Sequence, residues 1–166
     1  ASFGFTLIEV VVSISLVALL SGALLVGFQG AQRSSSARHA AEEFAGFLRE
    51  TAALAVNGVK DPSCGPGPSC SQYVVSYTSG SGTYDRKSVG VASGVVQTLP
   101  PGTTFSASGS LTYSLAPPVL TVDAATGRLS PADTLPVPVA HVSDPKSSRN
   151  VCVGGTGSVF VTKATC

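Results

Sequence analysis

The chain has 166 residues, of which 11% are charged, and its formal net charge at pH 7 is +1. This length suits one modest globular domain beside a long helix and leaves no room for a second catalytic domain. The near-neutral balance excludes a global basic surface of the kind that drives nonspecific nucleic-acid binding, while local patches stay open.

The N-terminal region combines a lone acid with a long apolar run. No residue between Glu9 and Arg33 carries a charge, and residues 10–31 are rich in Val, Leu, Ile and Ala. At about 1.5 Å rise per residue, this run is long enough for a helix to cross a hydrocarbon core of roughly 30 Å, so we expect a transmembrane helix. A carboxylate in lipid costs on the order of 3 kcal/mol, which makes Glu9 a predicted functional residue that needs a partner.

The same helix is predicted to continue as an amphipathic stem to about Val56. No Pro interrupts the chain between Glu9 and Pro62, and Asn57-Gly58 is a helix stop signal. Apolar residues recur at helical spacing from 44 to 55, and this face is expected to pack on the domain that follows. The opposite face is expected to be solvated, and it carries Glu42, Glu43, Arg49 and Glu50.

The remaining residues are predicted to form a β-rich head. Residues 61–71 contain three Pro and two Gly and are expected to be an irregular loop. Alternating apolar runs predict strands at 73–78, 84–92, 95–99, 104–107, 111–115, 119–122, 135–142, 150–153 and 158–163. Pro136 and Pro138 place their strand at a sheet edge. The predicted fold class is α+β, with a long N-terminal helix packed on a small antiparallel β-sheet.

All four Cys follow the helix, at positions Cys64, Cys70, Cys152 and Cys166. An even number of Cys in an exported, anchored chain predicts disulfides and an oxidising compartment. Pairing each Cys with its sequence neighbour is the simplest of the three connectivities, and all three stay open. Zinc is the weaker alternative, because neither spacing is the short pair of zinc modules and His39 and His141 are isolated.

The stretch Gly4-Phe5-Thr6-Leu7-Ile8-Glu9, followed by an apolar helix, resembles the processing and methylation site of type IV prepilins and type II secretion pseudopilins. The resemblance implies that prepilin peptidase cuts between Gly4 and Phe5 and methylates the new terminal Phe5. It also implies that Glu9 forms an ion pair with the terminal amine of a neighbouring subunit, which helps to set register. The competing interpretation is a plain signal anchor, which needs no acid; a secretory signal peptide fits worse because the apolar run is too long.

The resemblance further implies a division into a leader remnant at 1–4, a helix at 5–57 and a head at 58–166. The family's leader is usually basic, and Ala1-Ser2-Phe3-Gly4 has no Lys or Arg, so we expect the natural leader to begin before Ala1. The expected location is the bacterial inner membrane, crossed once with the head outside the cytoplasm, and then a filament.

The implied function is that of a structural subunit of a type IV pilus or a type II secretion pseudopilus. Its implied partners are prepilin peptidase, other pilin or pseudopilin subunits of the helical filament, the inner-membrane assembly platform, and membrane lipid before assembly. The alternative function is a tip-located minor pilin whose head binds DNA, a surface or a secreted protein.

The head also resembles one branch of the superfamily, the GspH/FimT-type pseudopilins and minor pilins. The resemblance rests on the Ala-rich stem at 40–55, the Thr126-Gly127-Arg128 turn, and a strand at 149–153 that leads through a Gly turn into 158–161. Some members bind DNA through a Gly-Arg-x-Arg turn near the C-terminus. The corresponding turn here reads Gly157-Ser158-Val159-Phe160 with only Lys163 nearby, and this departure argues against DNA binding.

The sequence shows no pattern that predicts catalysis. It has no nucleophile elbow, and residues 154–157 lack the Lys-Ser or Lys-Thr of a phosphate-binding loop. The acids of the head are scattered singly and do not form a calcium loop. They are Asp61, Asp85, Asp123, Asp133 and Asp144. We therefore expect neither an enzyme nor a cofactor or metal site.

Overall fold

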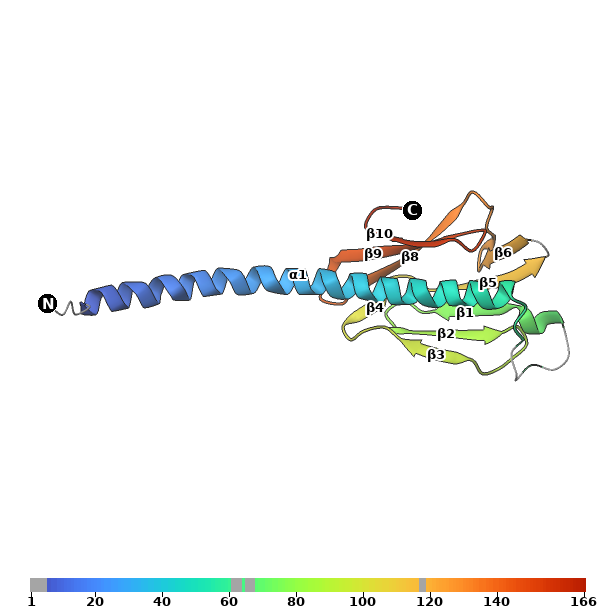
Figure 1. Cartoon of the computed structure of the whole chain (residues 1–166), viewed down its shortest axis with the longest axis horizontal. Coiled ribbons are helices and arrows are strands. Elements are labelled where there is room, and N and C mark those ends of the chain that lie inside the picture. The colour runs from blue at the N-terminus through green and yellow to red at the C-terminus, as the bar shows by residue number, and fades with distance from the viewer. Residues whose placement is uncertain (1–5, 61–63, 65–67, 117–118) are drawn as a thin grey trace.

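The computed structural model describes residues 6–60, 64, 68–116 and 119–166; within these ranges the side chains of residues 23–27, 68–69 and 116 are not described. One long helix, α1 (Leu7–Val56), projects beyond a β-rich head and lays its C-terminal part against that head (Figure 1). We call residues 7–28 the free segment, 29–36 the junction and 37–56 the docked segment. The predicted α+β fold is confirmed.

The end of α1 is set by a left-handed glycine. Gly58 has a φ of 61°. Its backbone N donates to the Ala55 carbonyl at 3.2 Å, and Val59 N donates to the Leu54 carbonyl at 3.1 Å. This pair of bonds is a Schellman motif, which favours Gly because no Cβ opposes the positive φ. The predicted helix stop is therefore confirmed.

Two antiparallel sheets make up the head and contact α1. The six-stranded sheet has the order β3 (Val95–Thr98), β2 (Thr83–Ser88), β1 (Tyr73–Tyr77), β5 (Gly109–Ala116), β6 (Val119–Ala124) and β7 (Gly127–Arg128). The four-stranded sheet has the order β10 (Val159–Thr162), β9 (Asp144–Gly154), β8 (Thr134–His141) and β4 (Thr103–Phe105). A short 3-10 helix, η1 (Pro68–Ser71), precedes β1.

Backbone hydrogen bonds join the two sheets beside β4. Phe105 N donates to the Ser81 carbonyl at 3.1 Å, and Gly80 N donates to the Phe105 carbonyl at 2.9 Å. In Figure 1, β8, β9 and β10 lie above α1 and β1, β2 and β3 lie below it. The head thus wraps around the docked segment from two sides.

The predicted edge position of the strand with two Pro is wrong. β8 lies between β9 and β4, so it is an interior strand. β4 ends at Phe105, which pairs with Val139, and Ser106 N then donates to the Pro138 carbonyl at 2.9 Å. The N side of Pro138 points in the same direction as its carbonyl, and that of Pro136 does too. Both Pro therefore direct their N side toward the edge of β8 on which β4 lies. They precede the stretch of β8 that pairs with β4, so no neighbouring strand needs a backbone N–H from them.

The core lies between the docked segment and both sheets. Phe44 is fully buried, and its ring meets those of Tyr84 and Phe105 edge to face at centroid distances of 5.0 Å each. Leu48 and Ala55 on the same face are also fully buried. The prediction that the apolar stem face packs on the head is therefore confirmed.

Two residues on the charged face of the stem contact the head. Arg49 donates from Nε and Nη2 to the Val159 carbonyl at 3.2 and 2.9 Å. Glu50 accepts from Arg86 Nη1 at 3.0 Å, and the Arg86 guanidinium lies 4.9 Å from the centre of the Phe47 ring. Arg49 and Glu50 are exposed as expected, but the prediction of a merely solvated face is wrong for them because both contact the head.

Candidate functional site

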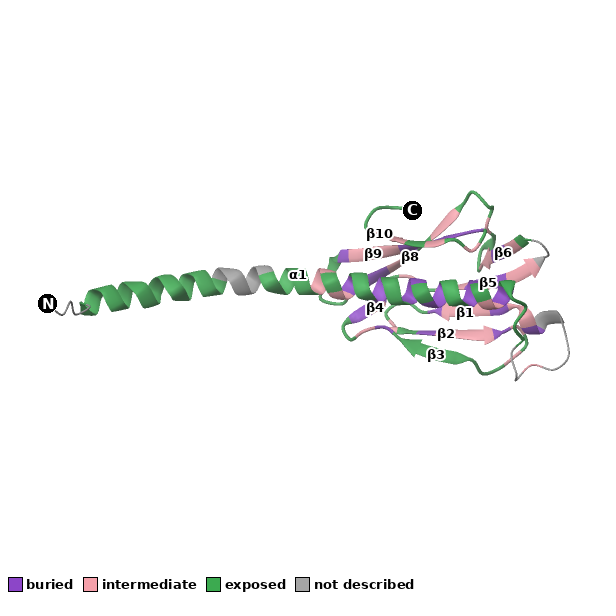
Figure 2. Ribbon diagram, in the orientation of Figure 1, coloured by how far each residue is buried: buried purple, intermediate pink, exposed green. Residues whose placement is uncertain are grey.

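The described residues of the free segment are exposed (Figure 2), and many of them carry large apolar side chains. Leu7 is 83% exposed, Leu19 73% and Phe28 70%. The other large apolar side chains described as exposed here are Ile8, Val10, Val11, Val12, Ile14, Leu16, Val17 and Leu20. Exposed apolar side chains in such number, over residues 7–20 and at Phe28, mark an interaction with a membrane or with another protein.

The polar side chains within this surface are satisfied by the helix itself. Ser13, Ser15 and Ser21 each donate a hydroxyl hydrogen bond to the carbonyl four residues earlier, at 2.7, 2.8 and 2.7 Å. Such back-bonding removes the cost of placing a hydroxyl in an apolar environment. The free segment is thereby suited to surroundings without water.

Glu9 lies in the first turn of α1, three residues after the N-cap Thr6. Its backbone N donates to the Thr6 carbonyl at 3.1 Å. A carboxylate is favoured here by the helix dipole. Among the described residues, nothing forms an ion pair or hydrogen bond with the Glu9 side chain, so its carboxylate is available to a group from outside them. The predicted processing residues Gly4 and Phe5 lie outside the described residues.

A membrane span was also expected of this helix. In the two stretches of α1 whose side chains are described, residues 7–22 and 28–56, no segment meets the length and hydropathy required to cross a membrane. The transmembrane helix therefore stays a prediction.

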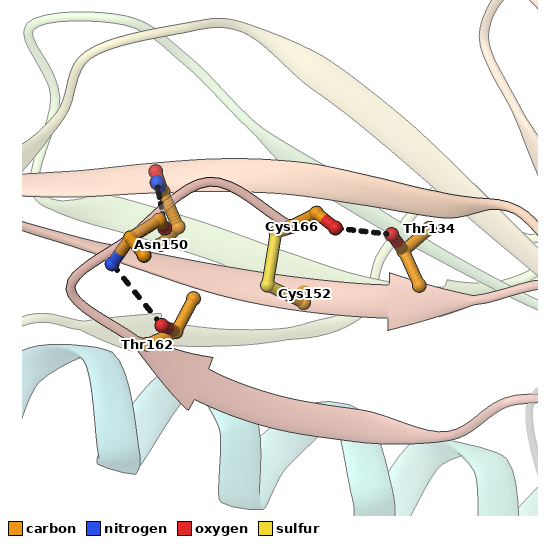
Figure 3. Close-up of a disulfide and its surroundings, with 6 residues drawn as sticks. Thr134, Asn150, Cys152, Thr162 and Cys166 are labelled. Atoms are coloured by element: carbon orange, nitrogen blue, oxygen red, sulfur yellow. Dashed lines mark hydrogen bonds between the residues drawn. A yellow bond between two sulfur atoms is a disulfide. The ribbon is translucent and has the colours of Figure 1, made fainter.

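The two disulfides join sequence neighbours: Cys64 to Cys70, with Cα atoms 5.6 Å apart, and Cys152 to Cys166, with Cα atoms 5.7 Å apart. Figure 3 shows how the second bridge folds the C-terminal tail back over β9. Asn150 Nδ2 donates to the Ala164 carbonyl at 2.9 Å and supports the same turn. The bridged sulfurs leave these Cys without a thiolate for zinc.

The described acids and the two His residues are spread over α1 and the head. Within the described part of the chain, no three His, Cys, Asp or Glu side chains lie close enough to hold an ion. Asp61 lies outside the described residues. His39 is exposed on α1, and His141 ends β8, where its Nδ1 accepts from Ser143 N at 3.2 Å.

The turn at Gly157, which the sequence analysis compared with a DNA-binding turn, packs against β6. Gly157 has a φ of 83°, its N donates to the Gly154 carbonyl at 2.9 Å, and a Cβ at this position would collide with the side chain of Leu120. Glycine is thus favoured by the positive φ, and its missing Cβ leaves room for the Leu120 side chain of β6. Lys163 is exposed beyond β10.

The phenols of the core stay neutral. Burial, with a smaller contribution from Glu43, raises the pKa of Tyr84 to about 12. Burial also raises the pKa of Tyr77 and, more strongly, that of Tyr113. The Tyr113 hydroxyl has no hydrogen-bond partner among the described residues. These groups are set for packing rather than for proton transfer near pH 7.

The fold forms a cleft at the junction that was not predicted from the sequence. Four residues of α1 and two of the head line a cavity of about 330 Å³. They are Gln29, Gln32, Arg33, Ser36, Pro101 and His141. The sequence analysis named two of these residues separately, Arg33 as the cation that ends the uncharged run and His141 as an isolated His. Their juxtaposition depends on long-range packing.

Comparison with known proteins bears on the N-terminal region. Residues 1–25 match the family model of the prokaryotic N-terminal methylation motif. No curated protein and no solved structure matches the chain. The motif belongs to structural proteins rather than enzymes, and it implies processing by prepilin peptidase and assembly with other pilins. Its position at the N-terminal end of a long helix that leads into an α+β head supports a type IV pilin-like or pseudopilin precursor, within the type IV pilin and pseudopilin superfamily.

Proposed function

We propose that this protein is a structural subunit that is processed by prepilin peptidase and assembled through α1 into a type IV pilus or a type II secretion pseudopilus. The observation that carries the proposal is the exposed apolar free segment, most of which lies within the match to the methylation motif. The surface is too long and apolar to remain in water. Lipid covers it before assembly, and the helices of neighbouring subunits cover it afterwards.

Processing supplies the partner of Glu9. Cleavage between Gly4 and Phe5 creates a terminal amine on Phe5, which is then methylated. When free segments pack side by side, the Phe5 amine of one subunit lies near the Glu9 carboxylate of the next. The attraction is strong away from water and offsets the cost of burying both charges only at good geometry. The pair therefore sets register along the filament.

The two disulfides support a head outside the cytoplasm. Bridges such as Cys64–Cys70 and Cys152–Cys166 persist in oxidising compartments. With α1 crossing the inner membrane once, the head stands on the outer side and the assembly platform contacts the subunit from within the membrane.

The experiment compares Glu9→Ala with Glu43→Ala, an exposed acid on the docked segment. Both variants are expected in the membrane fraction at the wild-type level, because neither removes apolar surface. Sheared filaments should lack Glu9→Ala and contain Glu43→Ala as in the wild type. Glu9→Ala present in filaments at the wild-type level would show that the proposed role of Glu9 is wrong.

A tip-located minor pilin of the GspH/FimT type is the second candidate, and an exposed sheet edge favours it. Every residue of β3 is exposed, with Val95 at 47% and Val96 at 64%. An open edge strand without charge or Pro is a surface on which a partner's strand can pair. The stoichiometry in purified filaments separates the candidates: one copy at every lattice position indicates the main structural subunit, and traces indicate the tip.

A further inference from the structure

We infer that the junction cleft binds the phosphate headgroup of an anionic phospholipid while the free segment lies in a bilayer. The inference rests on the proposed function, because it requires α1 to be inserted before assembly. It goes further in assigning a lipid site to side chains of both the helix and the head.

The cleft is built by the fold on two sides. Pro101 belongs to the turn between β3 and β4, and His141 ends β8. Val142 N donates to the Gly102 carbonyl at 2.9 Å, which ties this turn to the end of β8. Gly102 has a φ of 80°, and a Cβ there would lie 3.2 Å from His141 Nε2. The glycine thus lets the turn approach the imidazole closely and closes the head side of the cleft.

The helix side of the cleft presents unused donors. Among the described residues, nothing accepts a hydrogen bond from the side chains of Gln29, Gln32 or Arg33. His141 Nδ1 accepts from Ser143 N, so the neutral ring carries its proton on Nε2, on the side of Gly102. A planar guanidinium flanked by amide donors is well matched to the oxygens of a phosphate.

The cleft has no carboxylate to neutralise its cation. None of its six lining residues is Asp or Glu. The register partner of His141 is Asp144, but it does not line the cleft, and its Oδ1 accepts from Lys146 N at 3.2 Å. The local balance is therefore positive and favours a monoanion.

The position of the cleft along α1 indicates that the phosphate belongs to a membrane lipid. Gln29 follows Glu9 by twenty residues (29 − 9), which at about 1.5 Å per residue is roughly 30 Å of helix. This equals the thickness of the hydrocarbon core. Phe28, at 70% exposure, directly precedes the first residue of the cleft. With Glu9 near one face of the bilayer, the cleft stands at the headgroups of the other face.

The charge of the headgroup sets the selectivity. Phosphatidylglycerol offers a phosphate with a net charge of about −1, whereas the choline of phosphatidylcholine cancels that charge. Arg33 therefore favours the former. A free phosphate ion shares this chemistry but lacks the acyl chains that hold a lipid against the free segment.

The test uses native mass spectrometry of the full chain in detergent with equal amounts of phosphatidylglycerol and phosphatidylcholine. We expect about fivefold greater retention of phosphatidylglycerol, consistent with one arginine at a membrane surface. Arg33→Gln should remove the preference, and His141→Gln should reduce it. Arg128→Gln, an exposed cation on β7, should leave it unchanged; circular dichroism verifies that each variant is folded.

Equal retention of the two lipids by the wild type would overturn the inference, as would a preference that survives Arg33→Gln or that falls equally in Arg128→Gln. Displacement of the lipid by an equal concentration of inorganic phosphate would assign the cleft to a free anion instead. Flotation with pure phosphatidylcholine vesicles keeps the two proposals apart. A chain that floats with these vesicles but shows no lipid preference in mass spectrometry contradicts only the inference. A chain that does not float contradicts the proposed function.

Discussion

The free and docked segments of α1 form one uninterrupted helix, yet their apolar residues meet opposite surroundings. In the docked segment, Phe44 and Leu48 are fully covered by the sheets of the same chain. In the free segment, Leu7 and Leu19 are covered by nothing that the structure describes in the chain. The comparison teaches that the docked segment holds the subunit together, whereas the free segment is adapted to a partner outside it.

The kinds of residue differ accordingly. The docked segment buries small side chains, which let the sheets approach the helix closely; Ala37, Ala40, Ala41 and Ala45 are fully buried. The free segment carries bulky Val, Leu and Ile side chains, which provide a large apolar surface for contact with lipid or a second helix.

Truncating one Phe in each segment should give the largest difference in stability between the two segments. Phe44→Ala removes the ring at the centre of the aromatic cluster and should cost about 3–5 kcal/mol, because a buried cavity replaces it. Phe28→Ala removes a ring that is 70% exposed and should change stability by less than about 0.5 kcal/mol. Urea unfolding of the full chain in detergent, followed by circular dichroism, measures both. Equal losses would show that the two segments do not differ as described.

Removing a disulfide should destabilise the head without affecting the free segment. The Cys152–Cys166 bridge spans 14 residues, and its loss through Cys166→Ser should cost about 3 kcal/mol. The Cys64–Cys70 bridge spans 6 residues, so Cys70→Ser should cost less, about 2 kcal/mol. Thermal unfolding should show the head weakened and the free segment still helical. Loss of helix in the free segment together with the head would mean that the two are not independent.

The contact of Arg86 with the stem tests a smaller effect. The Arg86 side chain is 11% exposed, and it meets both Glu50 and the Phe47 ring. Arg86→Ala should therefore cost about 1–2 kcal/mol. Arg38→Ala removes an exposed pair with Glu42 that lies wholly on the helix and should have no measurable effect. The two urea midpoints decide the matter, and an equal shift would show that Arg86 does not anchor the stem.

The buried phenols predict an effect seen only in alkali. The pKa of Tyr84 is about 12 in the fold against 10.0 for an unperturbed phenol. The unfolded chain therefore loses this proton first, so stability is fully present below about pH 10 and falls as the pH rises toward 12. Tyrosinate absorbance and circular dichroism should change together above pH 10. Ionisation of these tyrosines with no loss of structure would contradict their burial.

Much of the fold was predictable because its signals are local. The stop at Asn57-Gly58 follows from the conformational freedom of glycine, and the alternation of apolar residues located the longer strands. β9 begins at Asp144, earlier than the predicted 150, because residues 144–149 are polar and include Pro145. Such residues are tolerated in a strand that is hydrogen-bonded to neighbouring strands, and the local sequence pattern does not reveal which strands will pair.

The parts that were not predictable depend on long-range pairing. The division into two sheets follows from β1 pairing with β5, and β4 with β8, across intervening strands. The interior position of β8 and the junction cleft have the same origin. Glu9 and the four Cys could be proposed as functional or bridging residues from sequence, because a lone acid in an apolar run and an even number of Cys are local signals. The contacts of Arg49 and Glu50 with the head could be seen only in the packed structure.

The most direct test of the account is a reconstruction of the intact filament at side-chain resolution. It should show a cut after Gly4, a free segment buried among its neighbours, and a Glu9 carboxylate within about 4 Å of the Phe5 amine of an adjacent subunit. A Glu9 carboxylate without any cationic neighbour, or a subunit that keeps its leader uncut, would contradict assembly through the free segment.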